Sequence, residues 1–165
     1  KDIAGVVGFL IIFLAILFFA PDFFGLFLEA PNFEPANPLK TPDHIAPVWY
    51  FTPFYAMLRA VPPMFGSQFP GVVVMFAAIL VMFFLPWLDR SPVKSIRYKG
   101  IIFKVALAVF AVTFVVLAWL GMKPASPILT LMAQIFTTIY FAFFLLMPWY
   151  SKIDKTKPVP ERVTG

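Results

Sequence analysis

Cysteine is absent from this chain, and histidine occurs once, at His44. Without a thiol there is no disulfide, no iron–sulfur cluster, no thiolate metal site and no cysteine nucleophile. A single imidazole also excludes a multi-histidine metal site made by this chain alone. The sequence therefore predicts no metal-ligand set within the chain.

Charged residues are scarce as well. They make up 13% of the sequence, against about 25% in a soluble domain, while 61% of residues are hydrophobic. The mean hydropathy is +0.89. The net charge of +5 would suit nucleic acid, but the basic residues follow a membrane pattern instead. These values predict a membrane protein that binds no nucleic acid.

Four apolar segments are long enough to cross a bilayer: residues 3–20, 69–88, 101–121 and 127–149. Each has about 18–23 residues, which at 1.5 Å per residue matches a hydrocarbon core of roughly 30 Å. The first is not a signal peptide, because Lys1-Asp2 is no cationic leader and no small-residue cleavage site follows. The prediction is an all-α membrane domain over residues 1–150 with four transmembrane helices.

The segments contain no Asp or Glu, and Lys104 is their only charge. Ion and proton transporters usually carry ionisable groups at mid-membrane, so a transporter is disfavoured. Gln134, Thr137, Thr138 and Tyr140 form one polar patch on the last segment, a pattern more typical of helix–helix contact than of a pathway. Function is therefore expected at the helix ends or in the connecting loops.

The long loop over residues 21–68 is rich in proline and contains a short helix at about 51–61, too short to span and expected to lie in the interface. Arg59 lies near the C-terminus of that helix, where a cation suits the dipole. The segment 90–104 is expected to be a solvated loop. Residues 151–165 are expected to form a polar tail, mobile unless a partner covers it.

The distribution of basic residues predicts how the chain is oriented in the membrane. If the spans alternate, Lys1, the segment 90–104 and the tail share one side with ten basic residues, and the other side has three. The positive-inside rule then predicts both ends of the segment in the cytoplasm and the loop 21–68 outside.

The run from Phe33 to Tyr50, Phe-Glu-Pro-Ala-Asn-Pro-Leu-Lys-Thr-Pro-Asp-His-Ile-Ala-Pro-Val-Trp-Tyr, is followed by Pro-Phe-Tyr-Ala-Met-Leu-Arg at 53–59. Together they resemble the C-terminal half of cytochrome b, the membrane core of the quinol–cytochrome c oxidoreductase (cytochrome bc) complexes. The resemblance extends over nearly the whole chain, from Lys1-Asp2-Ile3 at the start of the fifth family helix to the eighth helix. A fourth span favours the respiratory type over the chloroplast-type subunit, which ends after three.

This resemblance implies a portion of a multi-subunit enzyme in a bacterial inner membrane, active only within the complex. It implies quinol and quinone as substrates. Haem b is present in the complex but is ligated by the N-terminal half, which is absent from this sequence; His44 resembles the family's loop histidine and is no haem ligand. The implied partners are that N-terminal half, a Rieske iron–sulfur protein, a cytochrome c1-type subunit, the lipid bilayer and a second copy in a dimeric complex.

The resemblance also implies two sites. Tyr50 is the candidate catalytic residue, since it would offer the nearest side-chain hydroxyl to a quinol. Flat apolar walls with a few hydrogen-bonding groups suit a quinone ring. Lys1 and Asp2 match the pair at the quinone-reduction pocket, although Asp2 taken alone is equally a helix-end charge. The residues that match the quinol-oxidation pocket are Ile45, Pro47, Val48, Trp49, Tyr50, Phe51, Phe54, Tyr55, Met75 and Phe76.

One position departs from the common family motif, Pro-Glu-Trp-Tyr. Here the second residue is Val48, as in a bacterial Pro-Val-Trp-Tyr variant. Valine neither accepts a proton nor hydrogen-bonds through its side chain, so proton exit would need another group. The alternative from a different class is a non-catalytic membrane subunit that scaffolds a respiratory complex, with the same aromatic residues serving as an interfacial belt and core packing.

Overall fold

The computed structural model describes residues 1–161 and is helical, with no β-strand in that range. The predicted all-α class is confirmed. Four helical stretches are long and apolar enough to cross a membrane: Asp2–Phe19, Phe69–Leu88, Ile101–Met122 and Pro127–Leu145. The α-helices are α1 (Asp2–Phe19), α2 (Thr52–Ala60), α3 (Phe69–Leu80), α4 (Leu85–Leu88), α5 (Ile101–Met122), α6 (Pro127–Leu145) and α7 (Met147–Ile153). Short 3₁₀ turns lie at η1 (Phe23–Gly25), η2 (Ala30–Phe33), η3 (Trp49–Phe51), η4 (Val81–Phe84) and η5 (Ile96–Tyr98).

The chain divides into two compact units, Lys1–Trp49 and the part from Tyr50 onward. In the first unit α1 has no residue buried by protein, and a helix that is apolar all round is expected to be covered by lipid or by other protein. The chain turns sharply after Pro21, with Phe24 and Gly25 both at positive φ. The Trp49 indole donates a hydrogen bond to the Leu26 carbonyl at 2.8 Å. This bond joins the end of the first unit to the start of the loop 21–68.

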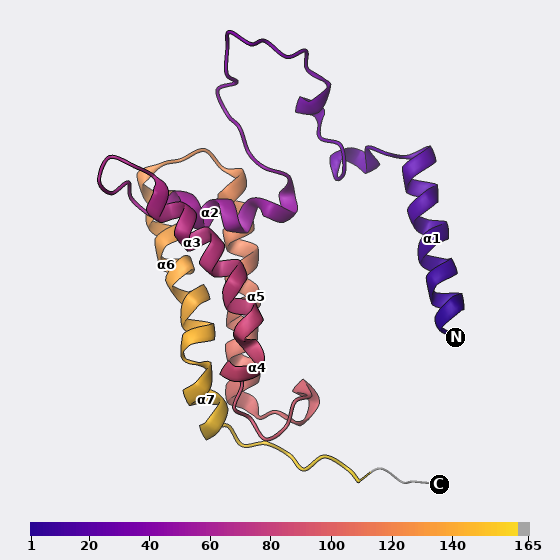
Figure 1. Ribbon diagram of the computed structural model, residues 1–165, viewed down its shortest axis with the longest axis vertical. Helices are drawn as coiled ribbons and strands as arrows, with labels where there is room; N and C mark the ends of the chain where they lie inside the picture. Colours follow the sequence, from indigo (N-terminus) through magenta and orange to yellow (C-terminus); the bar gives the residue numbers. More distant parts are fainter. Residues whose placement is uncertain (162–165) are drawn as a thin grey trace. The chain divides into compact units, whose positions relative to one another are not determined.

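The second unit is a bundle of α3, α5 and α6, with α2 lying across one end and α7 at the other (Figure 1). Its core contains Met57 of α2, Leu117 of α5, and Tyr140 and Phe144 of α6, each at most 2% exposed. Phe110 of α5 stacks on Phe143 at 4.4 Å between ring centroids. The burial of these large side chains holds α2, α5 and α6 together, and contacts between aromatic rings add to this packing.

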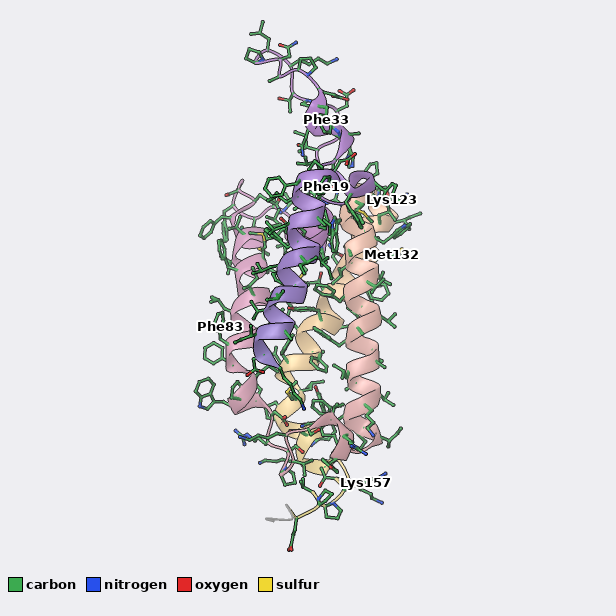
Figure 2. All side chains as sticks on the ribbon, turned by 90° about the vertical axis from the view of Figure 1, so that its right-hand side faces the viewer. Phe19, Phe33, Phe83, Lys123, Met132 and Lys157 are labelled. Atoms are coloured by element: carbon green, nitrogen blue, oxygen red, sulfur yellow. The ribbon has the colours of Figure 1, made fainter. Side chains whose placement is uncertain are left out.

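The polar patch predicted on residues 127–149 does connect helices. The Tyr140 hydroxyl donates to the Ala78 carbonyl of α3 at 2.7 Å, and the Gln134 amide donates to the Ala60 carbonyl of α2 at 2.9 Å. A buried hydroxyl or amide needs such a partner, because leaving it unpaired costs free energy. The outward faces are apolar: Phe83 is 70% exposed and points away from the bundle (Figure 2).

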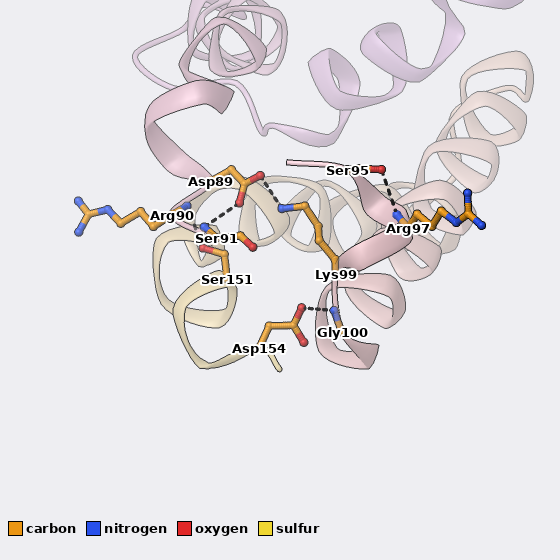
Figure 3. Close-up of polar contacts among 9 residues, drawn as sticks. All are labelled: Asp89, Arg90, Ser91, Ser95, Arg97, Lys99, Gly100, Ser151 and Asp154. Atoms are coloured by element: carbon orange, nitrogen blue, oxygen red, sulfur yellow. Dashed lines mark hydrogen bonds and ion pairs between the residues drawn. The ribbon is translucent and has the colours of Figure 1, made fainter. Parts of the chain in front are cut away.

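At the α7 end, the expectation of a solvated loop over 90–104 is wrong for Lys99. Its side chain is only 3% exposed, and its ammonium donates to the Asp89 carboxylate at 2.6 Å (Figure 3). The same ammonium lies 4.1 Å from the centre of the Phe103 ring. The long stem of Lys99 is thus covered by protein while its charge is paired, as a buried cation requires.

The beginning of the predicted tail is also folded rather than mobile. Ser151 is fully buried and accepts a hydrogen bond from the Arg90 amide, and the Asp154 carboxylate accepts one from the Gly100 amide at 2.8 Å (Figure 3). Burial, and secondarily the negative charge of Asp89, raise the pKa of the Tyr150 hydroxyl above its ordinary value. The basic residue Arg162 and the rest of the predicted tail beyond residue 161 lie outside the described residues.

Candidate functional site

Helix α2 follows directly on the Trp-Tyr pair of the loop motif and packs onto the end of α5. Pro53 is placed at the start of the helix, where its fixed φ suits the first turn. Ala56, Met57 and Ala60 form the buried face. Gly121 of α5 lies so close to α2 that a Cβ there would overlap the Thr52 carbonyl oxygen. The absence of a side chain at Gly121 therefore permits the contact between α2 and α5.

Two side-chain amides hold the C-terminal end of α2. The Gln68 amide donates to the carbonyls of Leu58 and Val61, at 3.0 and 2.9 Å. Gln134 donates to the Ala60 carbonyl, as described above. These amides satisfy carbonyls that a helix leaves without internal partners, so α2 is fixed to α6 and to the segment that precedes α3.

Arg59 acts differently from the sequence-based expectation. Its guanidinium donates to the carbonyls of Leu120 (2.8 Å) and Lys123 (3.0 Å), at the end of α5. The cation therefore interacts with the C-terminal dipole of α5 rather than only with that of its own helix. Sequence patterns do not predict this contact, because it joins residues more than 60 positions apart.

The predicted pocket residues from Tyr50 onward gather on η3, α2 and α3. Tyr50 and Phe51 are exposed, whereas Phe54 and Tyr55 are half-buried. The Phe51 and Phe54 rings lie 5.7 Å apart, and Phe54 also meets Phe114 of α5 edge-on at 6.1 Å. Phe114 was not predicted as a site residue. It lies one turn before Leu117, which is buried.

Two further predicted residues, Met75 and Phe76, lie on α3, which packs against α2. Met75 is half-buried and Phe76 is exposed. Phe76, like Tyr50 and Phe51, is a large aromatic side chain that this unit leaves exposed, whereas Met75 is partly covered. Exposed apolar side chains of this size are available to lipid, to a partner or to a ligand.

The remaining predicted residues belong to the first unit. Ile45, Pro47 and Val48 lie in an extended segment without regular structure, with Ile45 exposed and the other two half-buried. Trp49 makes the hydrogen bond to Leu26 described above. Lys1 and Asp2 are both exposed at the start of α1, with Asp2 in its first turn.

A separate apolar groove lies in the second unit, with a volume of about 590 Å³. No predicted site residue contributes to it. It is lined by Ala60, Val61, Pro62, Val74, Gln134, Thr137, Thr138, Phe141, Ala142, Leu145 and Leu146. The groove therefore does not include Tyr50, Phe51 or Phe76.

This chain does not carry the helix-borne histidines that the resemblance assigns to haem. Haem iron is held in proteins by His, Cys, Met or Tyr side chains in defined axial positions, and the resemblance calls for histidines on two helices. This sequence has one His, in the loop, and no Cys. Within residues 1–161 no three His, Cys, Asp or Glu side chains gather as a metal-ligand group.

Comparison with known proteins agrees with the motif. The family model described as "Cytochrome b(C-terminal)/b6/petD" matches residues 35–141. The chain is 74% identical to cytochrome b of Allochromatium vinosum over 165 residues, covering 100% of this chain and 40% of that protein. It is 44% identical to cytochrome b of Rhodospirillum rubrum over 166 residues, covering 39% of that protein.

Among solved structures, the chain is similar to one of a hyperthermophilic respiratory Complex III. The TM-score is 0.73 with 40% sequence identity, over 91% of this chain and 36% of the other. The chain therefore spans about two fifths of the length of the curated relatives that it matches.

Proposed function

This chain belongs to the cytochrome b C-terminal family, and we propose that it forms part of the quinol-oxidation pocket of a quinol:cytochrome c oxidoreductase. The observation that carries the proposal is the Pro47-Val-Trp-Tyr50 motif leading into α2, which is held rigidly on the bundle while Tyr50 and Phe51 stay exposed. A quinol needs apolar, flat walls and a few fixed hydrogen-bonding groups, and this segment supplies both.

Each residue type has a role in the proposed pocket. Phe51, Phe54 and Phe76 offer ring faces and edges against which the quinol ring packs. Tyr50 provides a hydroxyl that holds a quinol oxygen by a hydrogen bond. Val48 contributes apolar surface only, so the quinol protons leave by way of water, a backbone carbonyl or a group outside this chain.

The proposed complex contains other subunits that supply the haem and the electron acceptors. The N-terminal half of cytochrome b would hold haem b, since the single His of this chain does not provide a ligand set. A Rieske iron–sulfur protein and a cytochrome c1-type subunit would complete the electron path, in a complex that contains two copies of each. The large exposed apolar area of the spans, including Phe83, is consistent with cover by lipid and by these partners.

Replacement of Tyr50 tests the pocket. Tyr50→Leu removes the hydroxyl but keeps apolar bulk, and loss of a hydrogen bond of about 0.5–1.5 kcal/mol should lower quinol:cytochrome c turnover roughly two- to tenfold. The measurement is turnover of the assembled complex with inhibitors specific for each quinone pocket. Full turnover with unchanged sensitivity to quinol-oxidation inhibitors would favour the scaffold alternative.

We place Lys1 and Asp2 at the rim of the quinone-reduction pocket, on the opposite side of the membrane. An exposed carboxylate at the start of a helix is positioned to hydrogen-bond a quinone oxygen and to relay a proton. Asp2→Asn should slow reoxidation of haem b through that pocket by roughly a hundredfold or more, because it removes the proton relay. The first turnover at the quinol-oxidation pocket should be spared; unchanged reoxidation would leave Asp2 a helix-end charge.

The chain is a multi-pass membrane protein, and we propose the bacterial inner membrane with both ends of the segment in the cytoplasm. The asymmetry of ten basic residues against three supports this orientation. Single cysteines at Lys40 and Lys94 should react with an impermeant reagent from opposite sides: the first in intact spheroplasts, the second only after lysis. Labelling of both in intact spheroplasts would contradict the orientation.

A further inference from the structure

The end of α5 presents carbonyl groups that its own helix does not satisfy. The last carbonyls of an α-helix lack internal donors and carry the negative end of the helix dipole. The Leu120 carbonyl receives the Lys123 amide at 3.2 Å and also the Arg59 guanidinium at 2.8 Å. The Lys123 carbonyl receives a second guanidinium nitrogen of Arg59 at 3.0 Å. One arginine of α2 therefore closes the end of α5.

The same guanidinium contacts an aromatic ring. The central carbon of the Arg59 guanidinium lies 4.8 Å from the centre of the Tyr55 ring. Residues 55 and 59 are four apart on α2 and so share one face of that helix. A cation over an aromatic face is attracted to it, and an arginine can do this while its edge donates hydrogen bonds elsewhere.

Tyr55 is therefore linked to α5 through Arg59. This matters because α2 has nine residues, a length at which an isolated helix is marginal and tertiary contacts decide its position. Tyr55 follows Phe54 in α2, and both belong to the residues proposed above for the quinol-oxidation pocket. The ring of Tyr55 is contacted by Arg59, which is not among those pocket residues.

We infer that Arg59 is a positioning residue of the quinol-oxidation pocket, fixing the Tyr55 ring by joining it to the C-terminal carbonyls of α5. The inference rests on the proposed function, since it assigns Tyr55 to the pocket. Lysine cannot replace arginine here, because an ammonium is a point charge without the planar fork that reaches two carbonyls while covering a ring.

A double-mutant cycle in the assembled complex tests the link. Arg59→Lys keeps the charge but loses the fork, and it should raise the KM for quinol about tenfold, the equivalent of one charge-assisted hydrogen bond, with a smaller change in kcat. If Arg59 acts through Tyr55, the same substitution added to Tyr55→Leu should change KM by less than about twofold, because coupled residues are not additive.

Gln134→Met is the matched control. It removes the hydrogen bond to the Ala60 carbonyl and so loosens α2 without touching Arg59 or Tyr55. Its effect on KM should be the same with and without Tyr55→Leu, as for an independent structural contact. Should Arg59→Lys fail to assemble, Arg59→Gln takes its place in the same cycle, because it also loses the planar cation over the ring, and the same two results are expected.

Equal factors for Arg59→Lys in both backgrounds would overturn the inference and leave Arg59 a purely structural residue. An unchanged KM in Tyr55→Leu would overturn it as well. The proposed function is judged separately: if Tyr50→Leu still lowers turnover and sensitivity to quinol-oxidation inhibitors, only the role of Arg59 fails.

Discussion

Gly121→Ala should abolish most quinol oxidation, lowering turnover by roughly a hundredfold. The added Cβ would overlap the Thr52 carbonyl oxygen, which is backbone and does not rotate away. Helix α2 must then move off α5 by about 1 Å, and a displacement of that size at a reacting centre costs on the order of a hundredfold in rate. Steady-state quinol:cytochrome c turnover of the purified complex measures the loss.

Val115→Ile is a suitable control for that substitution. It adds one carbon to the same helix, but Val115 is 66% exposed, so turnover should change little. Quinone reduction on the other side of the membrane should survive Gly121→Ala. Near-normal quinol oxidation in Gly121→Ala would show that the position of α2 does not govern the pocket.

Asp89→Ala should lower the thermal stability of the complex more than any single surface substitution in this chain. The substitution leaves the Lys99 ammonium, 3% exposed, without its partner. Breaking a buried ion pair from one side costs about 3–5 kcal/mol, and the lower end applies because Asp89 is itself 24% exposed. The half-life of activity at elevated temperature is the appropriate measure for an assembly that unfolds irreversibly.

The reciprocal variant gives the control. Lys99→Met removes the buried charge and leaves Asp89 with access to water and with its hydrogen bond from the Ser91 amide. It should therefore be clearly milder than Asp89→Ala, and combining Lys99→Met with Asp89→Leu should recover most of the stability, as for other buried pairs replaced by apolar groups. Equal damage from Asp89→Ala and Lys99→Met would contradict an unpaired buried charge as the cause.

The long helices were predictable because their cause is local. Uninterrupted apolar runs of the right length, ended by Pro21, Gly121 or Pro124, specify spanning helices without reference to the rest of the fold. Helix α2 was predictable for the same reason, within one residue at each end, from its length and its proline-rich approach. The motif around Val48 identified the family, which the comparisons then showed.

Contacts between distant residues were not predictable. Nothing near Arg59 in the sequence predicts its contacts with the carbonyls of Leu120 and Lys123. Gly121 is equally typical of a helix end and of a close contact between helices. The basic composition of the loop 90–104 predicts a solvated Lys99, whereas Lys99 pairs with Asp89, which lies immediately before that loop. Local patterns report which helices form, whereas the partners of their ends depend on how the helices pack.

Photolabelling with a quinol analogue tests the central claim most directly. The assembled complex would be irradiated with a photoreactive quinol, digested, and the labelled peptides mapped by mass spectrometry, with and without an inhibitor of quinol oxidation. The account predicts label on residues 45–55 that the inhibitor suppresses. Label confined to other segments, or label on residues 45–55 that persists undiminished in the presence of the inhibitor, would contradict it.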